Sequence, residues 1–328
     1  MPLINRRVAI EISVSSQPTF KMKPLIFTLC LVFAFGRVSA QTNVWQPTPG
    51  HRQIPLWPGA VPEAGKQPVT GSESVMNMVT KDGVRWIAAL NVTQPTMTVY
   101  SPKGTNTGAA VVVLPGGGYM CLAMDLEGTE ICNWLTSRGI TAVLLKYRVP
   151  VNKEGLYGES RAALQDAQRA LGLVRYRAAE WRVNPHKIGV IGFSAGGHLV
   201  AATSTRFDKR SYPGVDAADK ESCRPDFGIA LYPGHLWKRV GPVKLNPNIT
   251  VTSNTPPTFL VQAEDDPVDP VFESVAYYMA LKNAGVPVEM HLYAQGGHAF
   301  GLRHPEFPIS EWPRLVEKWF GTIRMISK

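Results

Sequence analysis

The sequence predicts an α/β fold in which a mostly parallel central sheet carries helices on both faces. From residue 96 onward, short β-branched or apolar runs alternate with segments of helical periodicity. The run at residues 109–114 is continuously apolar, which is typical of a strand buried on both faces. A chain of 328 residues with 45% hydrophobic and 18% charged residues can also supply a large core. Strands that alternate with helices imply right-handed βαβ connections and therefore parallel strands.

The first 40 residues are expected to be a leader rather than part of this fold. Lys21 and Lys23 precede an apolar stretch at residues 25–35, and the small residues Ser39 and Ala40 predict signal-peptidase cleavage before Gln41. The apolar stretch is too short for a membrane-spanning helix, which needs about 20 residues. We therefore expect a signal peptide that starts at Met22, a secreted or periplasmic protein, and no stable membrane insertion after cleavage.

Residues 41–71 are dense in proline and glycine, and we expect an extended N-terminal arm that lies over the body rather than an element of the core. The catalytic domain is then predicted over residues 72–328, with no internal repeat and no need for a second domain. Strands are expected at residues 96–100, 109–114, 140–145, 187–193, 227–232, 258–262 and 286–293. Helices are expected at residues 127–137, 161–181, 195–203, 271–284 and 311–325.

The charge pattern gives little support to nucleic-acid binding. The net charge of +9 falls to +5 without the leader, which carries five basic residues and one acidic residue (34 − 5 = 29 against 25 − 1 = 24). No run of five like charges occurs, and no basic stripe is interleaved with aromatic residues.

The remaining cysteines, Cys121, Cys132 and Cys223, are odd in number, so at most one disulfide can form and a disulfide framework is excluded. No HExxH motif or Cys-His cluster suggests a metal, and no cofactor motif is present, so neither a metal nor a cofactor is predicted.

The segment Gly192-Phe193-Ser194-Ala195-Gly196 fits the G-x-S-x-G nucleophile elbow. It joins a predicted strand to a helix of small residues, and such a turn needs small neighbours because backbones crowd there. We therefore predict Ser194 as a nucleophile. The alternative is a serine that only caps the helix.

A serine hydroxyl needs a base, and a base needs an orienting acid. His298 lies in a glycine-rich loop after the last predicted strand, where its side chain can reach the carboxyl edge of the sheet. Four carboxylates follow the preceding strand, and we choose Asp265 as the acid because it comes first, with Asp266 as the alternative. His198 is interpreted as a packing residue, one helical turn after Ser194.

The run Leu114-Pro-Gly-Gly-Gly-Tyr119 can supply backbone N–H groups to a developing oxyanion, and Ala195 N–H can supply another. A phosphate-cradling role for this loop is disfavoured because it lacks the Lys-Ser/Thr of a P-loop. Tyr119 is predicted to contact the substrate.

Several segments together resemble the α/β-hydrolase superfamily, and more narrowly the exported bacterial esterases related to acetyl xylan esterases and hormone-sensitive-lipase-like enzymes. They are IPLWPGAVPEAG (54–65), LPGGGY (114–119), LKYRVP (145–150), VNPHKIGVIGFSAGGHLVA (183–201), AEDDPV (263–268) and GGHAF (296–300). The resemblance implies a triad of Ser194, Asp265 and His298, with Gly116, Gly117 and Ala195 as oxyanion donors. One departure is Pro115, where many relatives carry histidine before the glycines.

We therefore expect a secreted serine esterase that removes short acyl groups, foremost acetyl, from xylan or other carbohydrate esters. The connections at 205–224 and 234–257 are too short for a large lid domain, which leaves access for a polymer or a small ester. Two alternatives remain open: a prolyl-oligopeptidase-like serine peptidase, and a catalytically silent binding module with a hydrolase fold.

Overall fold

The computed structural model describes residues 44–64, 71–79, 83–150, 160–238, 241–303 and 306–326. The expected leader lies outside these residues, as does His304. All the described residues belong to one compact unit.

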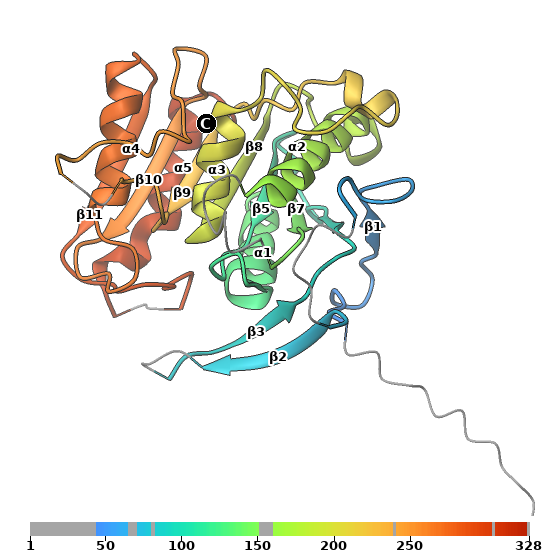
Figure 1. The fold of residues 1–328 in the computed structure, drawn as a ribbon, viewed down its shortest axis with the longest axis horizontal. Helices are drawn as coiled ribbons and strands as arrows, with labels where there is room; N and C mark the ends of the chain where they lie inside the picture. The colour runs from blue at the N-terminus through green and yellow to red at the C-terminus, as the bar shows by residue number, and fades with distance from the viewer. Residues whose placement is uncertain are drawn as a thin grey trace, which may run out of the picture. The chain divides into compact units, whose positions relative to one another are not determined.

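The central sheet of the described chain has eight strands in the order β1-β4-β7-β5-β8-β9-β10-β11 (Figure 1). Their bounds are β1 Gln53–Pro55, β4 Thr96–Tyr100, β5 Ala110–Leu114, β7 Thr141–Lys146, β8 Ile188–Phe193, β9 Gly228–Leu231, β10 Thr258–Ala263 and β11 Val288–Tyr293. The strands from β7 to β11 run parallel, and only β4 and β1 are antiparallel to their neighbours. The chain order reverses direction between β5 and β8, so their carboxyl ends form a topological switch point.

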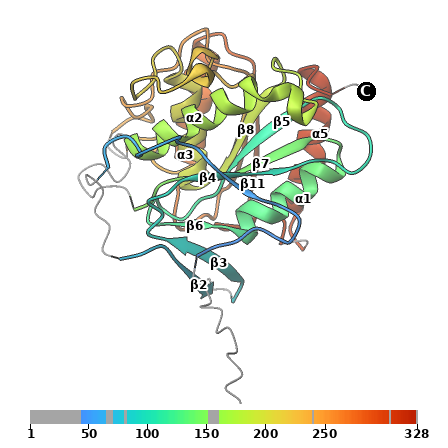
Figure 2. The ribbon, with the colours of Figure 1, turned by 90° about the vertical axis from the view of Figure 1, so that its right-hand side faces the viewer.

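Five longer helices cover the sheet: α1 Glu130–Ser137, α2 Arg161–Tyr176, α3 Ala195–Thr205, α4 Phe272–Asn283 and α5 Trp312–Thr322. Figure 2 shows α2 and α3 on one side of the sheet and α1 and α5 on the other. The rings of Trp134 on α1 and Trp312 on α5 meet edge to face, with centroids 5.1 Å apart. The predicted α/β architecture is therefore confirmed, and the described residues contain no large lid domain.

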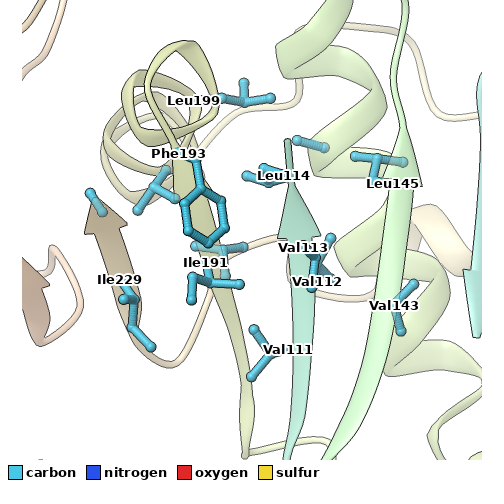
Figure 3. Close-up of a cluster of buried hydrophobic side chains, with 14 of the residues drawn as sticks. Val111, Val112, Val113, Leu114, Val143, Leu145, Ile191, Phe193, Leu199 and Ile229 are labelled. Carbon is cyan, nitrogen blue, oxygen red and sulfur yellow. The ribbon is translucent and has the colours of Figure 1, made fainter. Parts of the chain in front are cut away.

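The core lies where the central parallel strands meet the helices. Every residue of β5, β7, β8, β9 and β10 is buried, as expected for parallel strands covered on both faces. Figure 3 shows Val112, Val143, Ile191 and Ile229 projecting from neighbouring strands, with Leu199 of α3 above them. Burial of such side chains stabilises the fold by about 1.5–3 kcal/mol each.

A second, three-stranded sheet was not predicted. It consists of β2 Ser74–Val79, β3 Arg85–Leu90 and β6 Cys121–Ala123, in the order β2-β3-β6. In Figures 1 and 2 the antiparallel β2 and β3 lie outside the main sheet. Their segments SVMNMV and RWIAAL lack a clear period, because both strands are only half-buried and carry apolar residues on both faces.

The expectation that residues 41–71 stay outside the core is wrong. Strand β1 pairs with the edge strand β4, and the side chains of Trp45, Leu56 and Trp57 are buried. The Trp57 indole donates to Asp166 Oδ1 at 2.9 Å, and the guanidinium groups of Arg148 and Arg169 lie 5.9 and 5.8 Å from its ring centroid. A strand can form in this proline-rich segment because it lies at the sheet edge, where residues that donate no hydrogen bond are tolerated.

Helix α3 packs unusually close to the carboxyl end of β5. A Cβ atom on Gly196 would lie well under 3.0 Å from the carbonyl oxygens of Leu114 and Pro115. Because both oxygens belong to backbone, no side-chain movement can relieve that contact. Only glycine fits at this position.

We therefore predict that Gly196→Ala destabilises the protein by about 1–3 kcal/mol or more. The gain in helix propensity from glycine to alanine, about 1 kcal/mol, is too small to offset this overpacking. Urea unfolding at equilibrium measures the difference. Gly59→Ala is the matched control, because nothing lies within 4 Å of the added methyl group. Equal stability of the two variants would contradict the close approach.

Candidate active site

Ser194 lies at the turn between β8 and α3, in a strained backbone conformation with φ 51° and ψ −118°. Its N–H donates to Leu231 O at 3.1 Å, and its carbonyl accepts from Gly234 N at 3.3 Å. These bonds to the last residue of β9 and to the turn after it hold a conformation that costs about 1–3 kcal/mol for a non-glycine residue. The strand-turn-helix geometry of the predicted nucleophile elbow is therefore present.

His298 reaches Ser194 from the loop after β11. With the proton on Nδ1, the ring donates to Asp266 Oδ2 at 2.8 Å and accepts the Ser194 Oγ–H at Nε2 over 3.0 Å. The Tyr232 ring packs edge to face against the imidazole, with centroids 4.9 Å apart. The structure thus brings Ser194, His298 and Asp266 together in hydrogen-bonded sequence, as activation of a serine nucleophile by a general base requires. These three residues are called the relay below.

The choice of Asp265 as the acid is wrong in this geometry, and Asp266 takes its place. Asp266 is 7% exposed and also accepts from Gln262 Nε2 and from the backbone N–H groups of Val268 and Asp269. Asp265 is exposed, and its Oδ1 instead accepts Gly297 N–H at 2.8 Å. The turn after β10 directs the Asp266 side chain toward His298, whereas Asp265 accepts a hydrogen bond from the loop that carries His298.

A second carboxylate stands near the imidazole. Asp269 Oδ2 lies 4.0 Å from His298 Nε2, on the side of the ring that faces Ser194. Burial alone lowers the pKa of His298, but the hydrogen bond and charge of Asp266, together with Asp269 and Glu127, outweigh it and raise that pKa above its usual range. The surroundings therefore favour the imidazolium that forms when the histidine takes a proton.

The loop after β5 differs in detail from the prediction. The Gly116 N–H donates to the buried carboxylate of Glu127 at 2.7 Å, so it is already used and the assignment of Gly116 as an oxyanion donor is wrong. Gly117 and Gly118 follow it, with φ 123° and 61°, and both line the pocket beside Ser194. Ala195 begins α3, where the first N–H groups have no intrahelical acceptor. The candidate donors to an oxyanion are therefore the backbone N–H groups of Gly117, Gly118 and Ala195.

A pocket of about 390 Å³ opens in front of Ser194 and His298. Its apolar lining includes Leu126, and also Val79 and Trp86 from the unpredicted sheet. Sequence reasoning missed these residues because nothing in the pattern placed β2 and β3 at the site. A larger hollow of about 890 Å³ lies beside Lys187 and Lys318, before the start of β8 and on α5, and contains none of the three residues of the relay.

The prediction that Tyr119 contacts the substrate is wrong. Its side chain is fully buried, and its hydroxyl forms a 2.9 Å hydrogen bond with His198 Nδ1. Burial, with the charges of His235 and Arg206, lowers the pKa of His198 to about 3. His198 is therefore a neutral packing residue beneath the site, as the sequence indicated.

Within the described residues, Cys121, Cys132 and Cys223 are free thiols, and no group of three or more His, Cys, Asp or Glu side chains could hold a metal ion. No helix among those residues combines the length and apolar character needed to span a bilayer.

Two protein-family models match the chain. The BD-FAE model matches residues 97–227, which include the glycine loop and Ser194, and the prolyl oligopeptidase family model matches residues 231–323, which include Asp266 and His298.

Similar proteins include two curated enzymes and one solved structure. An acetylxylan esterase of Xylanibacter ruminicola is 30% identical over 63% of this chain and 44% of its own length. An endo-1,4-beta-xylanase B of Butyrivibrio fibrisolvens is 29% identical over 62% of this chain and 34% of its own length. The chain thus spans less than half the length of these two relatives. An acetyl ester-xyloside bifunctional hydrolase from Caldicellulosiruptor lactoaceticus is 34% identical, with a TM-score of 0.66, over 84% of this chain and 97% of that one.

We predict that Asp266→Asn lowers kcat for aryl acetate hydrolysis by about 10⁴-fold, because an amide stabilises the wrong histidine tautomer. Asp265→Asn is the matched control. It keeps a carbonyl oxygen to accept Gly297 N–H and should lose less than about tenfold in kcat. Steady-state kinetics of both variants decide the assignment. The reverse order of effects would restore Asp265 as the acid.

The pH dependence of kcat/KM tests the role of Asp269. His298 must be neutral to accept a proton, so activity falls as the pH drops through its pKa. Asp269→Asn removes one of the negative charges that raise this pKa, and the acid limb should therefore move to lower pH. A pH-rate profile from pH 4 to 9 shows the shift. An unchanged or upward-shifted limb would contradict an electrostatic effect of Asp269 on His298.

Proposed function

The chain belongs to the α/β-hydrolase family, as one of the esterases that resemble acetyl xylan esterases, and from this premise we propose that it hydrolyses acetyl esters of carbohydrates. The observation that carries the proposal is the Ser194–His298–Asp266 relay at the floor of a small apolar pocket.

In the first half of the reaction, Ser194 Oγ attacks the ester carbonyl carbon while its proton passes to His298 Nε2. The carbonyl oxygen becomes an oxyanion, and the N–H groups of the glycine loop and of Ala195 stabilise it. The C–O bond to the sugar then breaks, and the imidazolium gives its proton to the departing alkoxide. The product is a free sugar hydroxyl and an acetyl-Ser194 ester.

In the second half, His298 accepts a proton from a water molecule, whose oxygen attacks the acetyl carbonyl. The tetrahedral intermediate collapses, Ser194 recovers its proton, and acetate leaves. Asp266 keeps the imidazole in the required tautomer in both halves and stabilises its charged form.

The size of the pocket favours a short acyl group. At about 390 Å³ it lies near the lower end of small-molecule sites, and it must also admit part of the alcohol. Trp86 and Leu126 bound it with large side chains. A longer acyl chain would therefore meet protein instead of gaining about 0.8 kcal/mol per buried methylene.

Support for a xylan-derived substrate comes from the relatives, whose names include an acetylxylan esterase, a xylanase and an acetyl ester-xyloside hydrolase. The absence of a large lid domain from the described residues leaves room for a polymer. We also propose that the protein is exported, from the basic and apolar pattern of residues 21–40.

A peptidase activity is the second candidate, because the match to the prolyl oligopeptidase family covers both Asp266 and His298. The same relay would serve amide hydrolysis. It is therefore included as a separate substrate class in the test below.

We expect kcat/KM for aryl esters to fall from acetyl to butyryl to octanoyl, and acetate to be released from acetylated xylan or xylo-oligosaccharides. Ser194→Ala should lower kcat by about 10⁶-fold, because no other group replaces the nucleophile. Initial rates on the three esters, an acetate assay on the sugars, and a prolyl-peptide anilide provide the measurements.

A preference for octanoyl esters, or no acetate from any acetylated sugar, would overturn the carbohydrate proposal and leave an esterase of other specificity. Faster hydrolysis of the peptide anilide than of aryl acetate would favour the peptidase.

A further inference from the structure

Glu127 is a buried acid beside the catalytic centre that the reaction above does not use. It lies on a π-helical turn, Asp125–Thr129, directly before α1, and the residue is 2% exposed. Such turns are frequent at functional sites. A carboxyl group at this depth costs free energy unless its oxygens are hydrogen-bonded.

Both oxygens of Glu127 have partners, and the partners belong to different parts of the site. Oε2 accepts Gly116 N–H from the glycine loop at 2.7 Å, while Oε1 accepts the Tyr232 hydroxyl at 2.9 Å. The Tyr232 hydroxyl also accepts from Gly301 N at 3.4 Å, in the loop that carries His298. One side chain therefore links the oxyanion loop to the histidine loop.

The bond to Gly116 acts at the point where the loop crosses the nucleophile. A Cβ atom on Gly116 would lie 2.6 Å from Phe193 O and 3.0 Å from Ser194 Cβ, so the backbone passes directly over the elbow. The next residues, Gly117 and Gly118, both have positive φ and no Cβ atom to restrict them. Backbone N–H groups of Met120, Cys121 and Ala123 hold the carbonyl oxygens of Gly117 and Gly116, and the Glu127 bond adds an anchor on the N–H side, immediately before the two flexible glycines.

We propose that Glu127 is a positioning residue for the oxyanion hole, and that it acts as a hydrogen-bond acceptor for Gly116 N–H rather than through its charge. The inference rests on the proposed function, since it assumes an oxyanion at Ser194. Pro115, the residue before Gly116, has no side-chain hydrogen-bonding group, and Glu127 supplies a side-chain anchor for the loop.

Charge is a poor explanation for Glu127, because a negative charge beside the glycine loop would oppose an oxyanion. Burial raises the pKa of Glu127, and the hydrogen bonds from Gly116 and Tyr232 only partly counter it, which shifts the carboxyl toward its neutral form. A neutral side chain of the same length that can accept the Gly116 N–H should therefore position the glycine loop equally well.

Two substitutions at Glu127 distinguish the effect of side-chain length from the effect of charge. Glu127→Gln keeps the length and an acceptor oxygen but has no charge, whereas Glu127→Asp keeps the acid but is one methylene too short to reach Gly116. On the pH-independent plateau we expect Glu127→Gln to retain kcat/KM within about tenfold. Glu127→Asp should lose about 10²-fold, mainly in kcat, as for loss of an oxyanion donor.

The affinity for an aryl trifluoromethyl ketone is the second readout. Its hemiketal with Ser194 places an oxyanion where the transition state does. The Ki should therefore rise in Glu127→Asp by the same factor as kcat/KM falls, and it should change little in Glu127→Gln. Asp125→Asn is the control, because this neighbouring acid lies on the same turn but accepts Ile87 N–H instead of a bond from the glycine loop, and asparagine keeps an acceptor oxygen. It should retain kcat/KM within about tenfold.

Equal losses in Glu127→Gln and Glu127→Asp, a larger loss in Glu127→Gln, or a loss in Glu127→Asp without a change in Ki would each overturn the proposal. If the Glu127→Asp variant does not fold, as judged by its melting temperature and circular dichroism, Glu127→Met provides the same comparison with Glu127→Gln at similar length but without a strong acceptor. Failure of the proposed function would look different, since wild type would then leave acetylated sugars intact while the ketone still reported on the loop.

Discussion

The close approach of α3 to the end of β5 is the constraint on which the site depends. Gly196 lies against the Leu114 and Pro115 carbonyl oxygens, and Gly116 passes over Phe193 and Ser194 in return. These contacts are largely backbone to backbone and hold the oxyanion loop close to the nucleophile, and the Glu127 side chain adds a hydrogen bond to Gly116 N–H. The strained Ser194 conformation persists because its N–H bonds to the last residue of β9 and its carbonyl group bonds to the turn that follows β9.

Sheet register extends this constraint to the rest of the relay. Leu114 pairs with Gly192 across β5 and β8, so the glycine loop and the elbow leave the sheet at the same level. Strands β10 and β11 pair from Thr258↔Val288 to Ala263↔Tyr293, so the Asp266 and His298 loops also leave together. The chemistry therefore gathers at the carboxyl edge of the sheet, where parallel strands bring distant segments of sequence into contact.

The elements that depend on hydrophobic periodicity and on glycine spacing could be predicted from the sequence. Every strand from β4 to β11 in the central sheet and all five longer helices were predicted, and so was the meeting of Ser194 with His298. The choice between Asp265 and Asp266 failed because it depends on which way one turn carries its side chains. The role of Tyr119 was predicted wrongly, and the pocket walls from β2 and β3 were missed, for a related reason. A half-buried strand, or a residue under a loop, shows no hydrophobic period of its own. Glu127 gave a weak signal, as an acid in an otherwise apolar stretch, but Asp125 beside it gives the same one.

The arrangement of acidic groups divides the site into two electrostatic halves. Asp266 and Asp269 lie on the side of His298, where positive charge develops as the histidine takes the serine proton. The opposite half, where negative charge develops, presents backbone N–H groups, and the acid nearest to it is buried and hydrogen-bonded at both oxygens. Fixed dipoles stabilise an oxyanion without reorganisation, whereas an ionised carboxylate there would raise the barrier. Burial raises the pKa of Glu127 and so favours its neutral form, which lowers the electrostatic cost of an acid that anchors the oxyanion loop.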